Sequence, residues 1–336
     1  MKRCCILILL SAVVLSGCSR SRQYFPRDLK PYETHIVRFD NDLLNISRHS
    51  VREDIEVLYD KYPVFMPFFV EDILGIPIAD TAYLAHQLPL FLDDTVYGFA
   101  ATNSFEQQTF ADVSGIEREL SVAFGRCLYL FADWNVPEVC FFVSGFTSSL
   151  MFFEDGIAVG ADMYLGSDYP YYNRVVYDYQ KQTMRPECIA TDVVSAWLFR
   201  NIPYTARQSR LLDQMIYRGK VMYLLSVIFK EEPQYEVMGY KKEQWDWCVK
   251  YEKAIWSRII ERHDLFSTEQ RLLASYLNDG PFTSEVTQDS PGRVGTWVGW
   301  RIVESYMEHH PEVSMQALMQ ESDAQHILEE SQYRPR

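Results

Sequence analysis

The fold is decided by the stretch Ser290-Pro291-Gly292-Arg293-Val294-Gly295-Thr296-Trp297-Val298-Gly299-Trp300-Arg301-Ile302-Val303-Glu304-Ser305-Tyr306. It predicts a helix with a marked start, because Ser290 is a favourable N-cap and Pro291 suits the first helical position. Apolar side chains recur at helical spacing, and Trp297 and Trp300 widen the apolar surface beyond one stripe. We therefore expect this helix to lie inside the domain.

Two glycines mark one face of this predicted helix. Gly295 and Gly299 lie four residues apart, and each costs about 1 kcal/mol relative to alanine in a helix interior. A backbone packed closely against the bare face would offset that cost. The simplest interpretation of the stretch is a core helix that carries no chemistry of its own.

The rest of the chain predicts mostly helices around one small β unit. A strand is expected at 138–144, and a hairpin over 152–162 turns at Asp155-Gly156. A polar tail is expected after the helix of the opening stretch. The fold class is therefore α+β and mostly α-helical, with one small β-hairpin or sheet in a single domain, residues 37–330. Further helices are expected at 37–62, near Ile73, and at 79–93, 116–131, 189–200, 205–230 (or from 206), 241–262 and 268–277.

The N-terminus has the features of a lipoprotein signal peptide. Lys2 and Arg3 precede an apolar segment at 4–15, and Leu15-Ser16-Gly17-Cys18 resembles the lipobox of bacterial lipoproteins. This predicts removal of residues 1–17, acylation of Cys18 by chains such as palmitate, and a tether at 18–36. The alternative is an ordinary secretory signal with an incidental cysteine. No apolar run of transmembrane length follows.

Composition and charge narrow the function classes. The chain has 336 residues, of which 48% are hydrophobic, so it can bury a sizeable core. Without residues 1–17 it would carry 30 basic and 46 acidic residues, a net charge of −16. Such a chain is a poor nucleic-acid binder. No acidic run follows Cys18, which favours an outer-membrane lipoprotein that faces the periplasm.

Four cysteines lie in apolar surroundings beyond Cys18. They form no CxxC pair, so separate buried thiols are expected, although an oxidising compartment would permit a disulfide. They are Cys127, Cys140, Cys188 and Cys248.

No motif for a metal or cofactor is present. The seven histidines include no HExxH pair, and the chain has no GxGxxG, Walker or GxSxG motif. Asp162 and Asp192 are acids in apolar stretches. A purely structural role is open to each: Asp162 as a turn or cap residue, and Asp192 as an acid near a helix N-terminus. Arg218 and Lys220 interrupt an apolar helix face and either pair with these acids or extend to solvent. Asp162, Lys220 and Arg293 are the candidate residues of a polar cleft.

Several of these stretches together resemble the GldB family of gliding-motility lipoproteins of the Bacteroidota. The resemblance covers nearly the whole chain after the signal peptide, and its strength lies in the order and spacing of the marks. These marks are the lipobox at Cys18, Phe39-Asp40-Asn41-Asp42-Leu43, Tyr62-Pro63, Gly160-Ala161-Asp162-Met163-Tyr164-Leu165-Gly166, Arg218-Gly219-Lys220, Trp245 and the opening stretch.

The layout is also similar to that of predicted zinc proteases of the gluzincin type. That similarity would place Thr191-Asp192-Val193-Val194-Ser195 in the HExxH slot and Arg218-Gly219 in the Glu-Gly slot. Hydroxyls are poor zinc ligands and Arg218 would repel a dication, so the metal motif would be lost. The resemblance therefore implies a zincin-like domain with a degenerate site, closed by an Asp192–Arg218 ion pair.

Three functions follow as hypotheses. The first is a non-enzymatic envelope protein that is anchored through Cys18 and binds partners of the gliding or type IX secretion apparatus, as the resemblance implies. The second is a divergent hydrolase that uses Asp162 or Asp192. The third is a binding module for a small ligand or cell-wall fragment in the degenerate cleft. None of them needs a cofactor.

Overall fold

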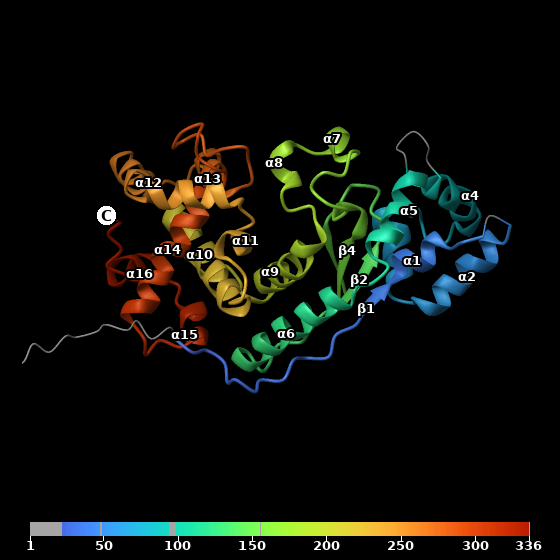
Figure 1. The fold of residues 1–336 in the computed structure, drawn as a ribbon, viewed down its shortest axis with the longest axis horizontal. Coiled ribbons are helices and arrows are strands. Elements are labelled where there is room, and N and C mark those ends of the chain that lie inside the picture. The colour runs from blue at the N-terminus through green and yellow to red at the C-terminus, as the bar shows by residue number, and fades with distance from the viewer. Residues whose placement is uncertain (1–21, 48, 94–98, 155, 336) are drawn as a thin grey trace, which may run out of the picture.

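Helices outweigh a single small sheet in the computed structural model, which describes residues 22–47, 49–93, 99–154 and 156–335 (Figure 1). This confirms the mostly helical α+β class. The sheet has the order β1-β2-β4-β3, with β1 (Ile36–Arg38), β2 (Glu138–Phe142), β3 (Leu150–Phe153) and β4 (Gly156–Gly160). β1 and β4 pair with β2 in parallel, and β3 pairs with β4 in antiparallel fashion.

The predicted hairpin is confirmed, with Phe152 opposite Ile157, while its turn residue Asp155 lies outside the described residues. The single helix expected at 37–62 is wrong, because this stretch contains the end of β1 and two separate helices, Phe39–Leu44 and Val51–Lys61. Val37 lies in β1 and pairs with Cys140 of β2. Strand pairing with a partner a hundred residues away overrides the local helical pattern there.

Side chains alternate between the two faces of the sheet, and both faces are buried. Cys140 and Phe142 of β2 face an apolar cluster with α1 (Phe39–Leu44), α2 (Val51–Lys61), α3 (Phe65–Phe68) and α4 (Thr81–Leu92). A π-helical turn, Phe69–Ile73, continues α3. Val139 and Phe141 face the larger cluster with α6 (Ser114–Leu130) and α9 (Ile189–Asn201).

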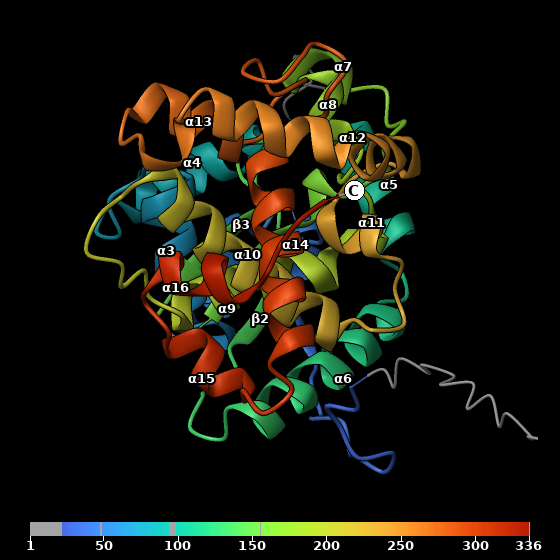
Figure 2. The same cartoon turned by 90° about the vertical axis from the view of Figure 1, so that its left-hand side faces the viewer.

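The C-terminal part of the chain is built on the crossing of α10 (Leu211–Ile228) and α14 (Val294–His309), which lie against each other in Figures 1 and 2. The expectation that the bare face of the helix contacts another backbone is confirmed. A Cβ added to Gly299 would lie 1.9 Å from the carbonyl oxygen of Met215, and one added to Gly295 would lie 3.0 Å from that of Tyr276. The helices that surround this pair are α11 (Gln234–Met238), α12 (Lys242–Glu261), α13 (Gln270–Leu277), α15 (Met315–Gln320) and α16 (Ala324–Glu330).

The start of α14 differs from the prediction. The helix begins at Val294, and Arg293 before it adopts a left-handed backbone with φ 58°. Ser290 does not cap the helix, because its hydroxyl oxygen accepts from the Thr283 N–H at 3.1 Å and no N–H of the described helix donates to it. Thr283 takes that role instead: its Oγ1 accepts from the Val294 N–H at 3.3 Å and donates to the carbonyl of Pro291 at 2.9 Å.

Other boundaries also differ. α10 begins at Leu211 and not at 205 or 206, Pro89 is accommodated within α4, and the expected polar tail contains α15 and α16. Four of the described helices were missed, three of which are too short to show a helical period. They are α5 (Phe99–Thr109), α7 (Tyr172–Val175), α8 (Asp178–Lys181) and α11.

Residues 22–36, assigned from the sequence to a tether, lie along α6. The Tyr32 N–H donates to the carbonyl of Ser121 at 2.8 Å, and the carbonyl oxygen of Lys30 would lie 2.8 Å from a Cβ on Gly125. Cys18 lies outside the described residues. Among those residues no helix combines the length and the apolarity needed to cross a membrane.

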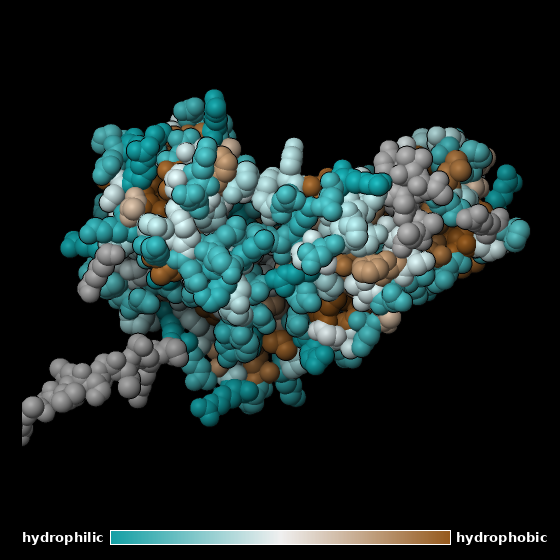
Figure 3. Space-filling view, turned by 45° about the horizontal axis from the view of Figure 1, so that its top comes forward, coloured by the Kyte–Doolittle hydropathy of each residue, from teal (hydrophilic) through white to brown (hydrophobic). Residues whose placement is uncertain are grey.

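The four cysteines of the described chain are free and buried, which confirms separate thiols. They are Cys127, Cys140, Cys188 and Cys248. The surface in Figure 3 is mostly hydrophilic, and its apolar side chains form small groups.

Candidate functional site

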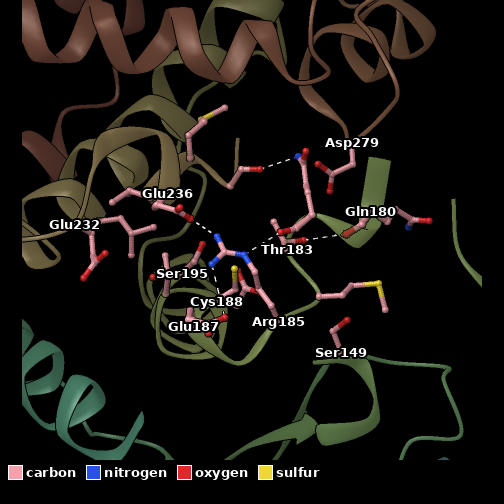
Figure 4. Close-up of a pocket in the computed structure, with 18 of the residues that line it drawn as sticks. Ser149, Gln180, Thr183, Arg185, Glu187, Cys188, Ser195, Glu232, Glu236 and Asp279 are labelled. Carbon is pink, nitrogen blue, oxygen red and sulfur yellow. Dashed lines mark hydrogen bonds and ion pairs between the residues drawn. The ribbon is translucent and has the colours of Figure 1, made fainter. Parts of the chain in front are cut away.

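A cavity of about 520 Å³ lies where α9, α10 and α11 meet the segment between α8 and α9 (Figure 4). Polar and charged side chains from distant parts of the sequence converge on it. From α9 come Thr191, Asp192 and Ser195, and Arg185, Glu236 and Arg293 come from other segments.

Asp192 lies on the face of α9 that borders the cavity. Thr191 and Ser195 flank it there, as their helical spacing requires. Tyr164 Oη donates a hydrogen bond to Asp192 Oδ2 at 3.0 Å. Burial raises the pKa of Asp192 to about 6, and the bond from Tyr164 and the charge of Arg293 limit the rise. Asp192 can therefore change its protonation state near neutral pH.

Arg185 holds one wall of the cavity in place. Its guanidinium forms an ion pair with Glu236 of α11 and lies 3.7 Å from Glu187, while its Nε donates to the carbonyl of Gln182 at 3.2 Å (Figure 4). These contacts join the segment before α9 to α11. An arginine that is paired in this way positions the wall and has few donors left for a ligand.

Arg293 holds a second wall. Its Nε lies 2.8 Å from Asp279 Oδ1, its Nη2 donates to the carbonyl of Met238 at 2.6 Å, and its guanidinium lies over the ring of Tyr240. The left-handed backbone at Arg293 directs the chain from the loop into α14. The site thus depends on the same turn that starts the central helix.

Acidic side chains outnumber basic ones around the cavity. Burial raises the pKa of Glu119, and the nearby charge of Glu232 raises it further. The cavity therefore favours a ligand that carries positive charge over an anionic one. The acids that line it are Glu119, Glu187, Asp192, Glu232, Glu236 and Asp279, against Arg185 and Arg293.

The structure separates the three residues predicted to share a polar cleft. Arg293 lines the cavity, whereas Asp162 and Lys220 do not. Asp162 is fully buried and accepts from the Ser144 N–H at 2.8 Å and the Phe146 N–H at 2.6 Å. It therefore caps the loop that follows β2, which is the structural role as a turn or cap residue that the sequence left open.

Lys220 also has a structural place. Its Nζ donates to the carbonyls of Met319 at 3.3 Å and Glu321 at 2.8 Å, at the C-terminal end of α15. Burial lowers its pKa to about 8. Neither alternative considered for Lys220 is met: it does not pair with Asp162 or Asp192, and it is buried and does not extend to solvent.

The residues of the degenerate-site alignment do not all line the cavity. Thr191, Asp192 and Ser195 do share one cavity wall, but Arg218 does not line it. Arg218 Nη1 donates to the carbonyl of Leu277 at 2.8 Å, and the ion pairs of the described residues include none between Asp192 and Arg218. The hydroxyl of Tyr164 takes the place of the expected cation, because Arg218 points toward the end of α13.

The remaining motif residues are structural. Trp297 and Trp300 are fully buried and contact Trp245, with ring centroids 5.9 and 5.4 Å apart. Gly295 and Gly299 serve helix packing, and Ser290 and Pro291 belong to the turn before α14.

Sequence reasoning missed Tyr164, Arg185 and Glu236. Tyr164 lies in a quoted motif, but nothing in its spacing relates it to Asp192. Arg185 and Glu236 are 51 residues apart and meet only through the packing of α11. No described group of three His, Cys, Asp or Glu side chains is arranged to hold a metal ion.

The model of a family described as gliding motility protein GldB matches residues 26–335. The chain belongs to the GldB family. Comparison with curated proteins and with solved structures gave no match. Membership in this lipoprotein family implies a role related to gliding motility and a place in the cell envelope.

Proposed function

We propose that this GldB-family chain is a lipid-anchored component of the gliding and type IX secretion machinery that works by binding partners and not by catalysis. Cys18 would hold it at the periplasmic face of the outer membrane. The observation that carries the proposal is the identity of the side chains that line the cavity. The hydroxyls of Thr191 and Ser195 line the cavity, whereas the similarity to zinc proteases would require imidazoles at these two positions.

The charged groups of the cavity support a binding role. Arg185 is paired with Glu236, Arg293 with Asp279, and Asp192 accepts from Tyr164. The pair of Arg185 and Glu236 joins the segment before α9 to α11, and the bond from Arg293 to the carbonyl of Met238 joins α11 to the start of α14. A surface fixed in this way is suited to recognition, because little side-chain freedom is lost when a partner binds.

The test uses cells that lack the native gene and express variants of the full chain. If the chain acts by binding, Asp192→Asn should restore gliding and secretion to the wild-type level, because the amide keeps the shape of the side chain and still accepts from Tyr164. Crosslinking in intact cells followed by purification of the chain should then recover components of the motility or secretion apparatus. Recovery of none of them from wild-type cells would contradict the proposal.

One observation favours a second candidate, a hydrolase. A carboxyl with a pKa of about 6 that borders a cavity is suited to general acid catalysis near neutral pH. Asp162 is already satisfied by backbone N–H groups, so Asp192 is the carboxyl to test. Loss of gliding in Asp192→Asn, with normal amounts of folded chain in the envelope, would favour this candidate.

The metal content of the full chain separates a binding protein from a rearranged peptidase. The chain is purified without chelators or a histidine tag and measured by mass spectrometry. We expect no stoichiometric zinc, because the described residues form no ligand set. Stoichiometric zinc would favour the peptidase.

A further inference from the structure

We propose that the surface formed by residues 22–31, the C-terminal end of α6 and the end of α10 docks on the membrane and holds the anionic headgroups of the bilayer beside Cys18. This surface is called the anchor face below. The inference rests on the lipid anchoring at Cys18 that belongs to the proposed function, and it adds the orientation of the folded body.

The first observation is the short distance between the anchor and the fold. Arg22 is already fixed, since its Nη2 donates to the carbonyl of Val313 at 2.5 Å. Tyr24 shares a hydrogen bond of 2.6 Å with Tyr223, and Phe25 is only 4% exposed. Four residue steps separate Cys18 from Arg22, which is at most about 14 Å of chain. The anchor face must therefore lie close to the headgroups.

The second observation is the charge of the anchor face. A groove of about 360 Å³ between residues 23–31, α6 and the end of α10 is lined by four cations, Arg27, Lys30, Arg126 and Lys230, and one acid, Glu231. The whole chain has 46 acidic and only 32 basic residues, so this concentration of positive charge is local. Asp28 lies in the same segment and does not line the groove.

Not every cation of the groove is held in an ion pair, so some remain available to bind anionic headgroups. Arg126 binds Glu231 through two bonds of 2.6 Å, and its guanidinium also lies over the ring of Phe25. Arg27 and Lys30 are exposed, and the ion pairs of the described residues include neither of them. A bilayer surface with anionic lipids attracts such side chains within about one Debye length.

The third observation is an aromatic rim beside the groove. Tyr129 is 53% exposed at the end of α6, and its ring contacts that of Phe25, with centroids 6.1 Å apart. Phe131 and Trp134 stack nearby, at 4.1 Å. Tyrosine and tryptophan favour the membrane interface, where the ring is partly buried and the polar end stays hydrated. Figure 1 shows residues 22–35 along the lower edge of the molecule, beneath α6.

The three observations agree on one occupant. A soluble anion would account for the cations of the groove but not for the exposed ring of Tyr129 or for the nearness of Cys18. A bilayer accounts for all three. The anchor face would then restrain rotation about the lipid anchor, so that the cavity has a fixed orientation in the envelope.

The experiment uses the full acylated chain in two kinds of vesicle, one of phosphatidylethanolamine with phosphatidylglycerol and one of phosphatidylcholine alone. The acyl anchor attaches the chain to both, so only docking of the body differs. Hydrogen–deuterium exchange should show protection of residues 22–31 and 122–134 in the anionic vesicles only. Raising the salt from 0.1 to 1 M should remove it, because the Debye length falls from about 10 to about 3 Å.

Two matched variants make the test specific. Lys30→Glu with Lys230→Glu should abolish the protection in anionic vesicles. Lys250→Glu with Lys253→Glu on α12 makes the same change of charge on exposed residues elsewhere and should retain it. Equal protection in both vesicle types, or equal behaviour of the two variants, would overturn the proposal.

The outcome is separable from that of the proposed function. The anchor-face variants leave the cavity untouched, so partner recovery in cells tests binding independently of lipid docking. The mass of the N-terminal peptide reports acylation of Cys18 directly, and an unmodified Cys18 would overturn the shared premise.

Discussion

Gly219 of α10 and Gly299 of α14 meet backbone to backbone. A Cβ on Gly219 would lie 2.3 Å from the carbonyl carbon and oxygen of Gly299, closer than any side chain tolerates. This contact sets the spacing between two helices that both contribute to the cavity. α10 supplies Met222 to its wall, and α14 begins directly after Arg293.

Gly299→Ala should therefore lower the free energy of unfolding by about 2–3 kcal/mol or more. The added methyl group would collide with the carbonyl of Met215, and the helices would have to separate. Chemical denaturation of the full chain measures the loss. The double variant with Gly219→Ala should cost less than the sum of the single variants, because one separation relieves both collisions.

Gly115→Ala is the control for this substitution. Gly115 also lies in a helix, α6, but the nearest atom to an added Cβ is the flexible guanidinium of Arg118, at 4.0 Å. The change should be neutral or stabilise the chain by up to about 1 kcal/mol. If Gly299→Ala were as stable as this control, the close packing of α10 and α14 would be refuted.

The close packing of the buried helix could be predicted from the sequence. The short strand β1 and the cap of α14 could not, because both depend on partners that lie outside the local sequence. Gly295 and Gly299 predicted a close backbone contact because their cost requires compensation nearby. β1 was missed, because three residues gain strand geometry only from pairing with β2. Ser290 was assigned the cap of α14, since nothing local shows that Thr283, eleven residues before Val294, reaches that N–H group.

The candidate site could also be predicted only where residues close in the sequence form it. The similarity to zinc proteases grouped Thr191, Asp192 and Ser195 in one slot of the sequence, and the three side chains do line the cavity. Arg185 and Glu236 meet there through tertiary packing, which has no signature in the spacing of residues. The pairing of Asp192 with Arg218 failed for a related reason, because the orientation of a long side chain depends on acceptors such as the carbonyl of Leu277.

Asp192 should make the stability of the chain depend on pH. Its pKa in the folded state is about 6, against 3.8 for an unperturbed carboxyl. The folded chain therefore holds the proton more tightly than the unfolded chain does. This stabilises the fold fully below about pH 4, and about 2–3 kcal/mol is lost as the pH rises through 6. Asp192→Asn should remove this loss, as unfolding midpoints from pH 4 to 8 would show.

Tyr164→Phe should shift the pH dependence that Asp192 gives to the stability of the chain, whereas Asp192→Asn should remove it. The hydroxyl of Tyr164 stabilises the carboxylate of Asp192, so its removal should raise the pKa of Asp192 further. The pH range of the stability loss would then move upward. Asp28→Asn, a change at an exposed carboxyl, serves as the control. An unchanged pH profile in Tyr164→Phe would show that the bond to Asp192 is not formed in solution.

Thr283→Val should weaken the start of α14. The substitution keeps the shape of a fully buried side chain and removes the acceptor of the Val294 N–H. We expect a loss of about 1–2 kcal/mol and faster hydrogen exchange at the Val294 amide. Thr287→Val, which removes a hydroxyl that accepts from the Asp289 N–H in the same loop, should leave the exchange of the Val294 amide unchanged. Equal exchange of that amide in Thr283→Val and Thr287→Val would contradict the assignment of Thr283 as the cap.

Cys188 should report on the charge of Asp192. Burial raises the pKa of Cys188 to about 12, and the negative charge of Asp192 adds to the rise. Alkylation of the folded chain at pH 8 should then be about a thousandfold slower than that of a thiol with an unperturbed pKa near 9. Asp192→Asn removes the repelling charge, so it should speed alkylation of Cys188 severalfold, measured by mass spectrometry of the peptide.

Cys127 provides the internal reference in the same sample. It is fully buried and does not line the cavity, so it should react only when the chain unfolds. A global loosening by Asp192→Asn would speed both thiols together, whereas a local electrostatic effect speeds Cys188 alone. Equal rates for Cys188 in the wild type and the variant would contradict the placement of the two side chains around one cavity. A selective increase would show that the carboxylate and the thiol interact in solution, as the shared cavity wall requires.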